Sequence, residues 1–352
     1  MSLSTSVLED ERIAHLEHAL AESRAIEETN KAALRQFHED LKEAYFQIAR
    51  QRQKLDVLTK KLQSNRASTE VPSEPAAPTQ PSCELEQKPT PLHTRPKVRS
   101  YPTLTGADAE RIKTLWQTLP SWTKGMISSV DAGFLDTLIK ALRPDQVYEV
   151  GVASGTSSAL ILSTMASYGD PSKIWLHSYD ITDICYFDPS HAIGDATRTM
   201  VPHLLKQWKV NPGTTALDVP RKKASQTKSL YFIDANHSHP WPTLDLIALL
   251  PGLKPGDHVA LHDINLPTIT AGRFPDYGVQ WLFEDWVGES IVPDVPVPNI
   301  GAIVIPEDKT VIRASLEKTL ARPWPLQMTT KSLHVLACEL CLSEFLRQST
   351  WA

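Results

Sequence analysis

Two predicted strands of this chain end in acidic and imidazole side chains. Residues 230–233 are four bulky apolar residues followed at once by Asp-Ala-Asn-His-Ser-His, and residues 257–262 predict a second strand, with Asp263 directly after His262. Neighbouring parallel strands present their carboxyl ends at the same edge of a sheet. Two carboxylates that meet there repel each other unless a proton or a cation lies between them. The pattern therefore predicts proton transfer or cation binding by Asp234, His237 and Asp263.

A strand, a glycine turn and a helix precede this pair of strands. The β-branched and aromatic residues at 147–150 predict a buried strand, and the apolar residues at 159–162 predict a helix. Between them, Gly151 and Gly155 allow a tight turn and the close approach of a ligand. The turn lacks the glycine spacing of dinucleotide-binding folds and the lysine of P-loops, which argues against both classes. It predicts a doubly wound α/β domain with a ligand at the carboxyl edge of the sheet.

Two further acidic residues fall at or near this edge. Residues 173–179 predict a second strand that ends at Asp180, where a carboxylate can accept hydrogen bonds from two ribose hydroxyls. A helix is expected up to residue 208, followed by a short strand over residues 214–218. Its last residue, Asp218, is a candidate for the adenine amino group, and a plain surface role fits it equally well. Candidate covers for the site are residues 181–193, expected to form a loop, and the aromatic segment 266–285.

The N-terminal part of the chain has a different composition. Residues 7–63 contain neither Pro nor Gly, and a seven-residue repeat that includes Ile13 and Leu62 is almost wholly apolar. This predicts a coiled-coil helix over residues 1–64, with self-association through residues 8–63. A single helix folded onto its own catalytic domain is the alternative. The Pro-rich residues 65–102 predict a disordered linker, and residues 103–352 the catalytic domain.

The composition limits the function classes. The 352 residues carry a formal net charge of −5, and no basic stripe with interleaved aromatic residues appears, which argues against nucleic-acid binding. The four cysteines show no disulfide-framework spacing, no apolar run is long enough to cross a bilayer, and the N-terminus does not resemble a signal peptide. These features predict a cytoplasmic protein without a membrane span.

Several of these motifs together resemble a known family. Glu-Val-Gly-Val-Ala-Ser-Gly-Thr-Ser, Phe-Ile-Asp-Ala-Asn-His-Ser-His, Leu-Lys-Pro-Gly and Leu-His-Asp follow one another between about residues 132 and 264. In order and spacing they resemble class I S-adenosylmethionine (SAM)-dependent methyltransferases, in the branch of macrolide-sugar and rhamnosyl O-methyltransferases and cephalosporin-hydroxylase-like proteins. The resemblance implies a Rossmann-like seven-stranded sheet with an antiparallel last strand. Residues 300–305 and 310–313 would supply its final hairpin.

The resemblance also implies roles for individual residues. Asp234 and Asp263 match the positions that hold a divalent cation such as Mg²⁺ in metal-dependent members. Those members often add a third ligand beside the second aspartate, where this chain has Ile264 and Asn265. Ser157 and the adjoining helix amides would hold the cofactor carboxylate. The complete set implied to bind SAM comprises Glu149, Gly151, Ala153, Ser154, Gly155, Ser157, Asp180, Asp218 and Asp234.

The predicted reaction is transfer of a methyl group from SAM to a hydroxyl of a small molecule, with a sugar, a glycosylated metabolite or a glycan as acceptor. The hydroxyl must lose its proton, either to His237 as general base or through a cation held by Asp234 and Asp263. Strand alternation points His262 away from Asp263, so a buried, hydrogen-bonded role is predicted for it. Alternatives are a hydroxylase-like or non-catalytic member of the same fold, and an assembly protein that works through its coiled coil.

Overall fold

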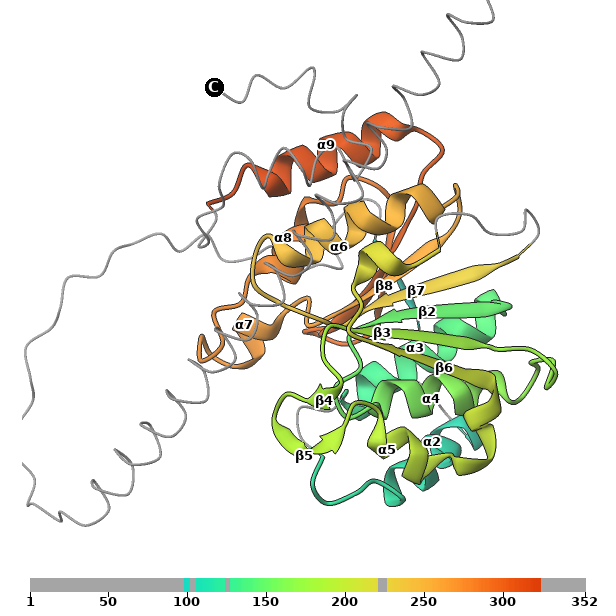
Figure 1. The fold of residues 1–352 in the computed structure, drawn as a ribbon. Helices are drawn as coiled ribbons and strands as arrows, with labels where there is room; N and C mark the ends of the chain where they lie inside the picture. The colour runs from blue at the N-terminus through green and yellow to red at the C-terminus, as the bar shows by residue number, and fades with distance from the viewer. Residues whose placement is uncertain (1–97, 102–105, 124–126, 221–226, 324–352) are drawn as a thin grey trace, which may run out of the picture. The chain divides into compact units, whose positions relative to one another are not determined.

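The computed structural model describes residues 98–101, 106–123, 127–220 and 227–323, which form an α/β unit (Figure 1). The predicted coiled coil of residues 1–64, the predicted linker up to residue 97 and the C-terminal residues 324–352 lie outside the described residues. Residues 98–101, expected to end the linker, form a strand.

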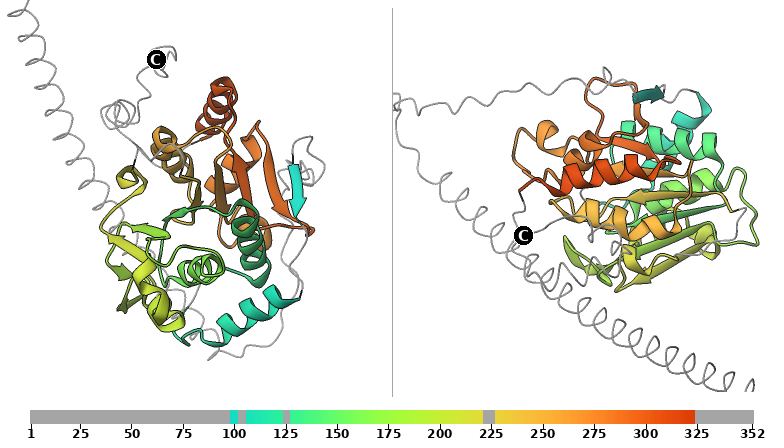
Figure 2. Two further views of the ribbon diagram at one scale, coloured as in Figure 1. Left: turned by 90° about the vertical axis from the view of Figure 1, so that its right-hand side faces the viewer. Right: turned by 90° about the horizontal axis from the view of Figure 1, so that it is seen from above.

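An eight-stranded sheet is the centre of the unit. Seven strands follow the predicted arrangement, because β10 is antiparallel to both of its neighbours while the other pairs are parallel. The eighth, β1, adds to the edge beside β9 (Figure 2, left). In spatial order the strands are β6 (Trp208–Pro212), β3 (Leu176–Asp180), β2 (Gln146–Val150), β7 (Ser229–Ile233), β8 (His258–His262), β10 (Ile300–Val304), β9 (Ser290–Pro293) and β1 (Val98–Tyr101).

Helices cover both faces of the sheet (Figure 1). One face carries α2 (Ala107–Gln117), α3 (Ser129–Leu142), α4 (Thr156–Met165) and α5 (Asp195–Met200). The other carries α6 (Trp241–Leu249), α8 (Gly278–Asp285) and α9 (Lys309–Leu320). This two-sided covering explains why the central strand β7 reads as an unbroken apolar run, since all five of its residues are buried.

Helix α4 shows how the layers form the core. Its Leu160, Ile161 and Leu162 are all fully buried, although three consecutive residues point in different directions around a helix. Such a helix must be enclosed on several sides, here by the sheet and by α3 and α5. Each fully buried aliphatic side chain of this kind contributes roughly 1.5–3 kcal/mol of transfer free energy. The core therefore fixes α4 and the turn before it.

Two predicted elements are wrong. Residues 309–320 form helix α9 and not the second strand of a hairpin; β10 pairs instead with β9 and β8. The β-branched residues at 310–312 suggested a strand, but Asp308 caps a helix whose buried residues Ile312 and Leu316 recur at helical spacing. The third strand likewise lies at Trp208–Pro212 and not at residues 214–218.

Residues 181–193 are more regular than expected. Strands β4 (Ile184–Cys185) and β5 (Asp188–Ala192) form a small antiparallel hairpin after β3. Figure 1 shows this hairpin and the short helix α7 (Leu266–Ile269) at the same side of the sheet, where β3 and β8 end. Among the described helices, none combines the length and the apolar character needed to span a membrane.

Candidate active site

The glycine turn lies directly against the end of the neighbouring strand β7. Gly151 has φ of 93°, and a Cβ atom placed on it would lie 2.1 Å from the carbonyl oxygen of Asp234. No side chain fits there, so glycine is required both by the backbone conformation and by the contact. Ala153 in the same turn also has a positive φ, of 47°. The turn is therefore held in an unusual shape next to the acidic residue that the sequence singles out.

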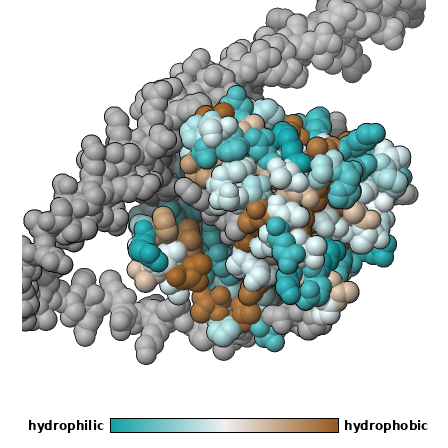
Figure 3. All heavy atoms as spheres, turned by 90° about the horizontal axis from the view of Figure 1, so that it is seen from below, coloured by the Kyte–Doolittle hydropathy of each residue, from teal (hydrophilic) through white to brown (hydrophobic). Residues whose placement is uncertain are grey.

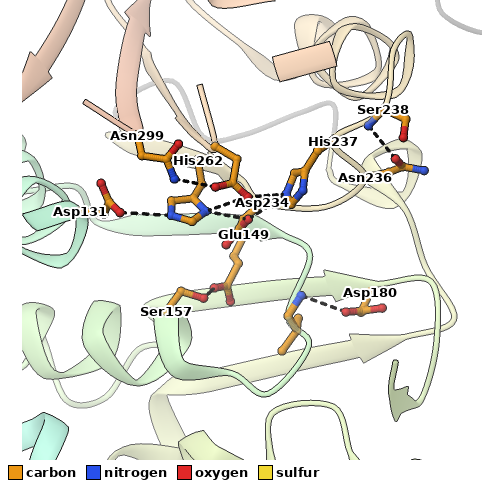
Figure 4. A network of polar contacts seen from close by, with 12 residues as sticks. Asp131, Glu149, Ser157, Asp180, Asp234, Asn236, His237, Ser238, His262 and Asn299 are labelled. Atoms are coloured by element: carbon orange, nitrogen blue, oxygen red, sulfur yellow. Dashed lines mark hydrogen bonds and ion pairs between the residues drawn. The ribbon is translucent and has the colours of Figure 1, made fainter. Parts of the chain in front are cut away.

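Asp180 braces this turn at the end of β3. One carboxylate oxygen accepts hydrogen bonds from the amides of Val152 and Ala153, at 2.9 and 3.1 Å (Figure 4). The other accepts from the amide and hydroxyl of Thr182. A carboxylate has capacity for further donors, so the predicted contact with a ribose stays a prediction.

Glu149 is enclosed by hydroxyl groups. Its carboxylate is fully buried and accepts hydrogen bonds from Ser157, Ser158 and Ser178, at 2.7, 2.5 and 2.5 Å. Burial raises the pKa of Glu149 to about 7, against the opposing effect of these hydrogen bonds. The carboxylate predicted to contact the cofactor instead ties β2 to β3 and to the start of α4.

The same contact changes the expected role of Ser157. Its hydroxyl points at Glu149 (Figure 4), so the group available to a ligand carboxylate at this position is the backbone amide. The first amides of a helix have no partner within the helix and attract anions. The first turn of α4, directly after the N-cap residue Gly155 with φ of 88°, keeps the capacity to bind an anion. Ser154, by contrast, is buried and its hydroxyl pairs with Thr156.

Asp234, His237, His262 and Asp263 form an acid–imidazole centre at the ends of β7 and β8 (Figure 4). His237 Nε2 lies 3.4 Å from Asp234 Oδ1 and 3.2 Å from Asp263 Oδ2. His262 Nδ1 lies 3.1 Å from Asp234 Oδ1 and 3.6 Å from Asp263 Oδ2. The side chains of Asp234 and His237 are 23% and 26% exposed, whereas that of His262 is 7% exposed. The centre thus opens to solvent on the side of Asp234 and His237.

The two imidazoles lower the pKa of both carboxylates. Burial by itself raises the pKa of Asp234, but His262 and His237 outweigh that effect and hold it well below its usual range. The pKa of Asp263 is lowered in the same way. Conversely, burial lowers the pKa of His262, but both carboxylates outweigh it and the pKa lies well above its ordinary value. The pKa of His237 is also raised, for the same reason.

The predicted direction of His262 is wrong, although its burial and hydrogen bonding are as expected. His262 is the last residue of β8, and Asp263 adopts a left-handed conformation with φ of 63°. The strict alternation of side chains ends where the strand ends. Both residues therefore reach the same centre.

Two residues that the sequence did not single out complete the network. Asp131 Oδ2, in the first turn of α3, lies 3.5 Å from His262 Nε2, and Asn299 donates a hydrogen bond of 2.6 Å to Asp263 Oδ1 (Figure 4). Asp131 is only 3% exposed, which is rare for an aspartate and consistent with a polar partner. No local pattern marks either residue, because each comes from a distant segment of the chain.

Asp218 does not lie at a strand end. It belongs to a 3₁₀ turn (Ala216–Asp218), where its carboxylate accepts from the Thr215 amide at 2.8 Å in a capping box. It is exposed, which agrees with the surface role that the sequence left open. Its predicted contact with an adenine stays a prediction.

Three residues of the centre also fit a divalent cation. Asp234, His237 and Asp263 each offer one ligand atom, and these atoms lie within 4.8 Å of one another. Two carboxylates and an imidazole are ligands that transition metals accept readily, while Mg²⁺ prefers oxygen alone. Asn265, two residues after Asp263, donates a hydrogen bond from its side-chain nitrogen to the Pro298 carbonyl at 2.5 Å. The third possible ligand beside the two aspartates is His237.

The aromatic segment expected to cover the site has both exposed and packed residues. Phe274 and Tyr277 are 55% and 38% exposed. Trp281 stacks on Tyr277, with ring centroids 5.5 Å apart, and lies under the guanidinium of Arg322 at 4.9 Å. Trp286 is buried. Phe274 and Tyr277 thus remain able to contact a ligand, whereas the tryptophans are part of the helical layer.

Comparison with known proteins agrees with this architecture. Residues 148–264 match the family model described as a methyltransferase domain. The predicted methyltransferase class is thereby confirmed; the predicted branch stays a prediction. The match covers both the glycine turn and the acid–imidazole centre. A search of curated proteins found no significant match.

Solved structures with a similar fold include several methyltransferases. An O-methyltransferase of Bacillus cereus in complex with SAH is 16% identical, with a TM-score of 0.36, and covers 57% of this chain and 92% of its own. TomG, an O-methyltransferase of Streptomyces achromogenes involved in tomaymycin synthesis, in complex with SAM, is 18% identical, with a TM-score of 0.37 and coverage of 58% and 92%. An SAH-bound methyltransferase of Podospora anserina is 14% identical, with a TM-score of 0.40 and coverage of 58% and 90%.

Proposed function

We propose that this protein is a SAM-dependent O-methyltransferase that acts on a hydroxyl of a small molecule. The observation that carries the proposal is the contact between Gly151 and the backbone of Asp234. It brings the turn of the methyltransferase domain next to a solvent-accessible acid–imidazole centre. Methyl transfer needs this arrangement, because the methyl donor and the group that removes the hydroxyl proton must meet at the same acceptor atom.

The glycine turn is the proposed site of SAM. Gly151, Ala153 and Gly155 would line its methionine side, and the amides at the start of α4 would hold its carboxylate. Asp180, already at the end of β3, would accept hydrogen bonds from the ribose. Glu149 would act indirectly, by fixing the turn and α4 through three serines. When bound, SAM would supply the methyl group, with its sulfur as the leaving group, so that SAH would remain.

His237 is the proposed acceptor of the hydroxyl proton. Its Nε2 is held between Asp234 and Asp263, and its imidazole is among the more exposed groups of the centre. The carboxylates raise the pKa of His237, so the neutral, proton-accepting form increases as the pH rises through that value. Where a divalent cation is bound, Asp234, His237 and Asp263 would hold it, and it would lower the pKa of the hydroxyl instead.

A sugar, a glycosylated metabolite or a glycan is the acceptor predicted from the sequence, and it stays a prediction. Self-association through residues 8–63 and a cytoplasmic location are predictions of the same kind. A hydroxylase of the same fold would add oxygen to its product, whereas a methyltransferase adds one CH₂ unit. If the protein were an assembly protein, deletion of residues 1–64 would abolish its function in cells and leave any turnover in vitro unchanged. Product mass and this deletion therefore distinguish the methyltransferase, the hydroxylase and the assembly protein.

The test is calorimetric titration of the full chain with SAM, with and without Mg²⁺, followed by SAH release with candidate acceptors. We expect SAM to bind, and His237→Gln to lower kcat by about 10²-fold with an unchanged Kd for SAM, as removal of a general base does. In the wild type, kcat/KM should rise with pH above neutrality. Loss of turnover on chelation, restored by a metal, would assign the proton chemistry to a cation. Absence of SAM binding would refute the proposed function.

A further inference from the structure

Most of the exposed large apolar side chains lie on segments next to the acid–imidazole centre or the glycine turn. Among the described residues, eight such side chains are markedly exposed, and all but Val287 lie on a segment that adjoins or hydrogen-bonds to one of these two sites. We name the other seven the apolar rim: Val130, Ile184, Tyr186, Ile269, Phe274, Tyr277 and Val297. Scattered exposed apolar residues are normal in proteins, but their concentration at one place marks a binding site.

Two members of the rim directly adjoin residues of the network. Val130 precedes Asp131, whose carboxylate lies 3.5 Å from His262. Val297 is two residues before Asn299, which donates to Asp263 at 2.6 Å. Both valines therefore lie on segments that carry residues of the network.

The segment that carries Phe274 and Tyr277 is fixed to the exposed side of the centre. The Gly278 amide donates a hydrogen bond of 2.8 Å to the carbonyl of His237. Asp276 accepts one of 2.6 Å from the hydroxyl of Ser238. The segment that carries Phe274 and Tyr277 is therefore hydrogen-bonded to the loop of His237, the proposed base. The two side chains are 55% and 38% exposed.

The hairpin β4–β5 supplies the remaining members from the cofactor side. It follows Asp180, and the Gly194 amide after it donates to the carbonyl of Ala153 in the glycine turn at 2.9 Å. Tyr186, at its tip, is 66% exposed, and Ile184 is 39% exposed. Figure 1 shows the hairpin and α7 at the same side of the sheet. The rim thus has members from both sides of the reacting groups.

An apolar cavity adjoins the same region. It has a volume of about 630 Å³, lies between α2 and α3, and is lined among others by Ile112, Trp116, Val130, Phe134 and Pro293. Figure 3 shows apolar side chains gathered on the face seen from below, the side on which α2 and α5 lie in Figure 1. A volume of this size suits a small molecule, and Val130 belongs to both the cavity and the rim.

We propose that the acceptor carries its hydroxyl on an apolar framework of aromatic or aliphatic rings or chains, and that it is not a free sugar or glycan. The inference rests on the proposed function, because it concerns the acceptor of the same site. A free sugar presents hydroxyl groups in most directions, and these would lose their water against the rim without gaining partners. An apolar framework loses no hydrogen bonds there and gains the transfer free energy of its buried surface. A glycosylated metabolite fits through its apolar aglycone.

The first test is calorimetric titration of the full chain, in the presence of SAH, with phenol, 4-ethylphenol, 4-butylphenol and methyl glucoside. We expect the Kd to fall about threefold for each added CH₂ group, and methyl glucoside to bind at least tenfold more weakly than 4-butylphenol. A Kd that does not depend on chain length, or tighter binding of the glucoside, would overturn the inference. Because binding is measured without turnover, failure of methyl transfer alone would count against the proposed function and not against the rim.

The second test uses two valines of similar exposure as a matched pair. Val130 and Val287 are 40% and 46% exposed, but Val287 is not a member of the rim, and its amide donates a hydrogen bond to Ser315 in the middle of α9. We expect Val130→Ser to weaken 4-butylphenol binding about threefold and Phe274→Ala about tenfold, while Val287→Ser and the Kd for SAM stay unchanged. Equal effects of both serine variants would refute the inference. A membrane role would also refute the inference. In that case the wild-type protein would sediment together with phosphatidylcholine vesicles, and Phe274→Ala would abolish this binding.

Discussion

Glu149, on β2, and Asp234, directly after the neighbouring strand β7, have surroundings that give the two acids opposite properties. Glu149 on β2 lies opposite Phe232 on β7, two residues before Asp234. Three serine hydroxyls surround Glu149, and burial raises its pKa to about 7. Two imidazoles adjoin Asp234 and hold its pKa well below the usual range, against the effect of burial. At Glu149 the hydroxyl groups only partly offset the effect of burial on the pKa, whereas at Asp234 the imidazoles more than offset it.

The difference separates a structural acid from a chemical one. Glu149 connects β2, β3 and α4 and presents no surface to solvent. Asp234 keeps its charge, contacts the proposed base and remains partly exposed. A carboxylate with a raised pKa titrates near neutrality, and its stability contribution depends on pH. A carboxylate with a lowered pKa stays ionised, and is able to orient an imidazole or hold a cation over the whole physiological range.

Replacement of the chemical acid gives the largest expected effect. Asp234→Asn keeps the volume but removes the charge, so it should lower kcat/KM by about 10³-fold, which corresponds to roughly 4 kcal/mol. The free energy of unfolding should change much less. The measurements are SAH release and urea unfolding. If Asp234→Asn retained more than a tenth of the wild-type turnover, Asp234 would have no chemical role and the contrast with Glu149 would fail.

The contact that brings the two regions together is tested by a pair of glycines. Gly151→Ala would place a methyl group 2.1 Å from the Asp234 carbonyl oxygen, while Gly256, with φ of 84°, has no atom within 4 Å of such a group. Gly256→Ala should cost about 1 kcal/mol, from its backbone conformation alone. Gly151→Ala should cost roughly 3 kcal/mol and also lower turnover. The measurement is chemical denaturation, and equal losses in both variants would show that the contact with Asp234 does not matter.

The third expected effect is a pH dependence of the free energy of unfolding. Folded Glu149 has a pKa of about 7 against an ordinary value of 4.5, so the folded protein retains a proton that the unfolded chain has lost between these values. Stability therefore falls as the pH rises from about 4.5 to about 7, by up to roughly 3 kcal/mol. Glu149→Gln, which resembles the protonated acid, should remove this decline.

Urea unfolding of the wild type and Glu149→Gln at several pH values between 4.5 and 8 checks this expectation. Other groups titrate in the same interval, so the difference between the two proteins isolates Glu149. Glu110→Gln, at an exposed acid on α2, serves as the control and should follow the wild type. Parallel curves for Glu149→Gln and the wild type would show that Glu149 is ionised in the fold, which would contradict its structural character.

Strong local signals made most of the fold predictable. The apolar strand runs, the two glycines and the polar residues after each strand were sufficient for the parallel strands and for the meeting of Asp234 and Asp263. Weaker segments were misread. Thr310, Val311 and Ile312 favour a strand by type, but the cap at Asp308 and the packing of Leu316 make a helix. The third strand was predicted at the wrong residues, because the position of Trp208–Pro212 depends on its pairing with β3 and not on its composition.

The sequence by itself was sufficient for the fold class, because the glycine turn and the strand ends are local features, and its resemblance to a known family supplied the class of protein. It also determined which residues carry ionisable groups at the ligand edge. Only the tertiary structure decided what surrounds each of them. Asp131 and Asn299 reach the centre from distant segments, His262 faces Asp263 because the chain turns left-handed there, and Glu149 meets hydroxyls instead of a cation. A pKa and a hydrogen bond depend on neighbours in space, which the order of residues does not specify.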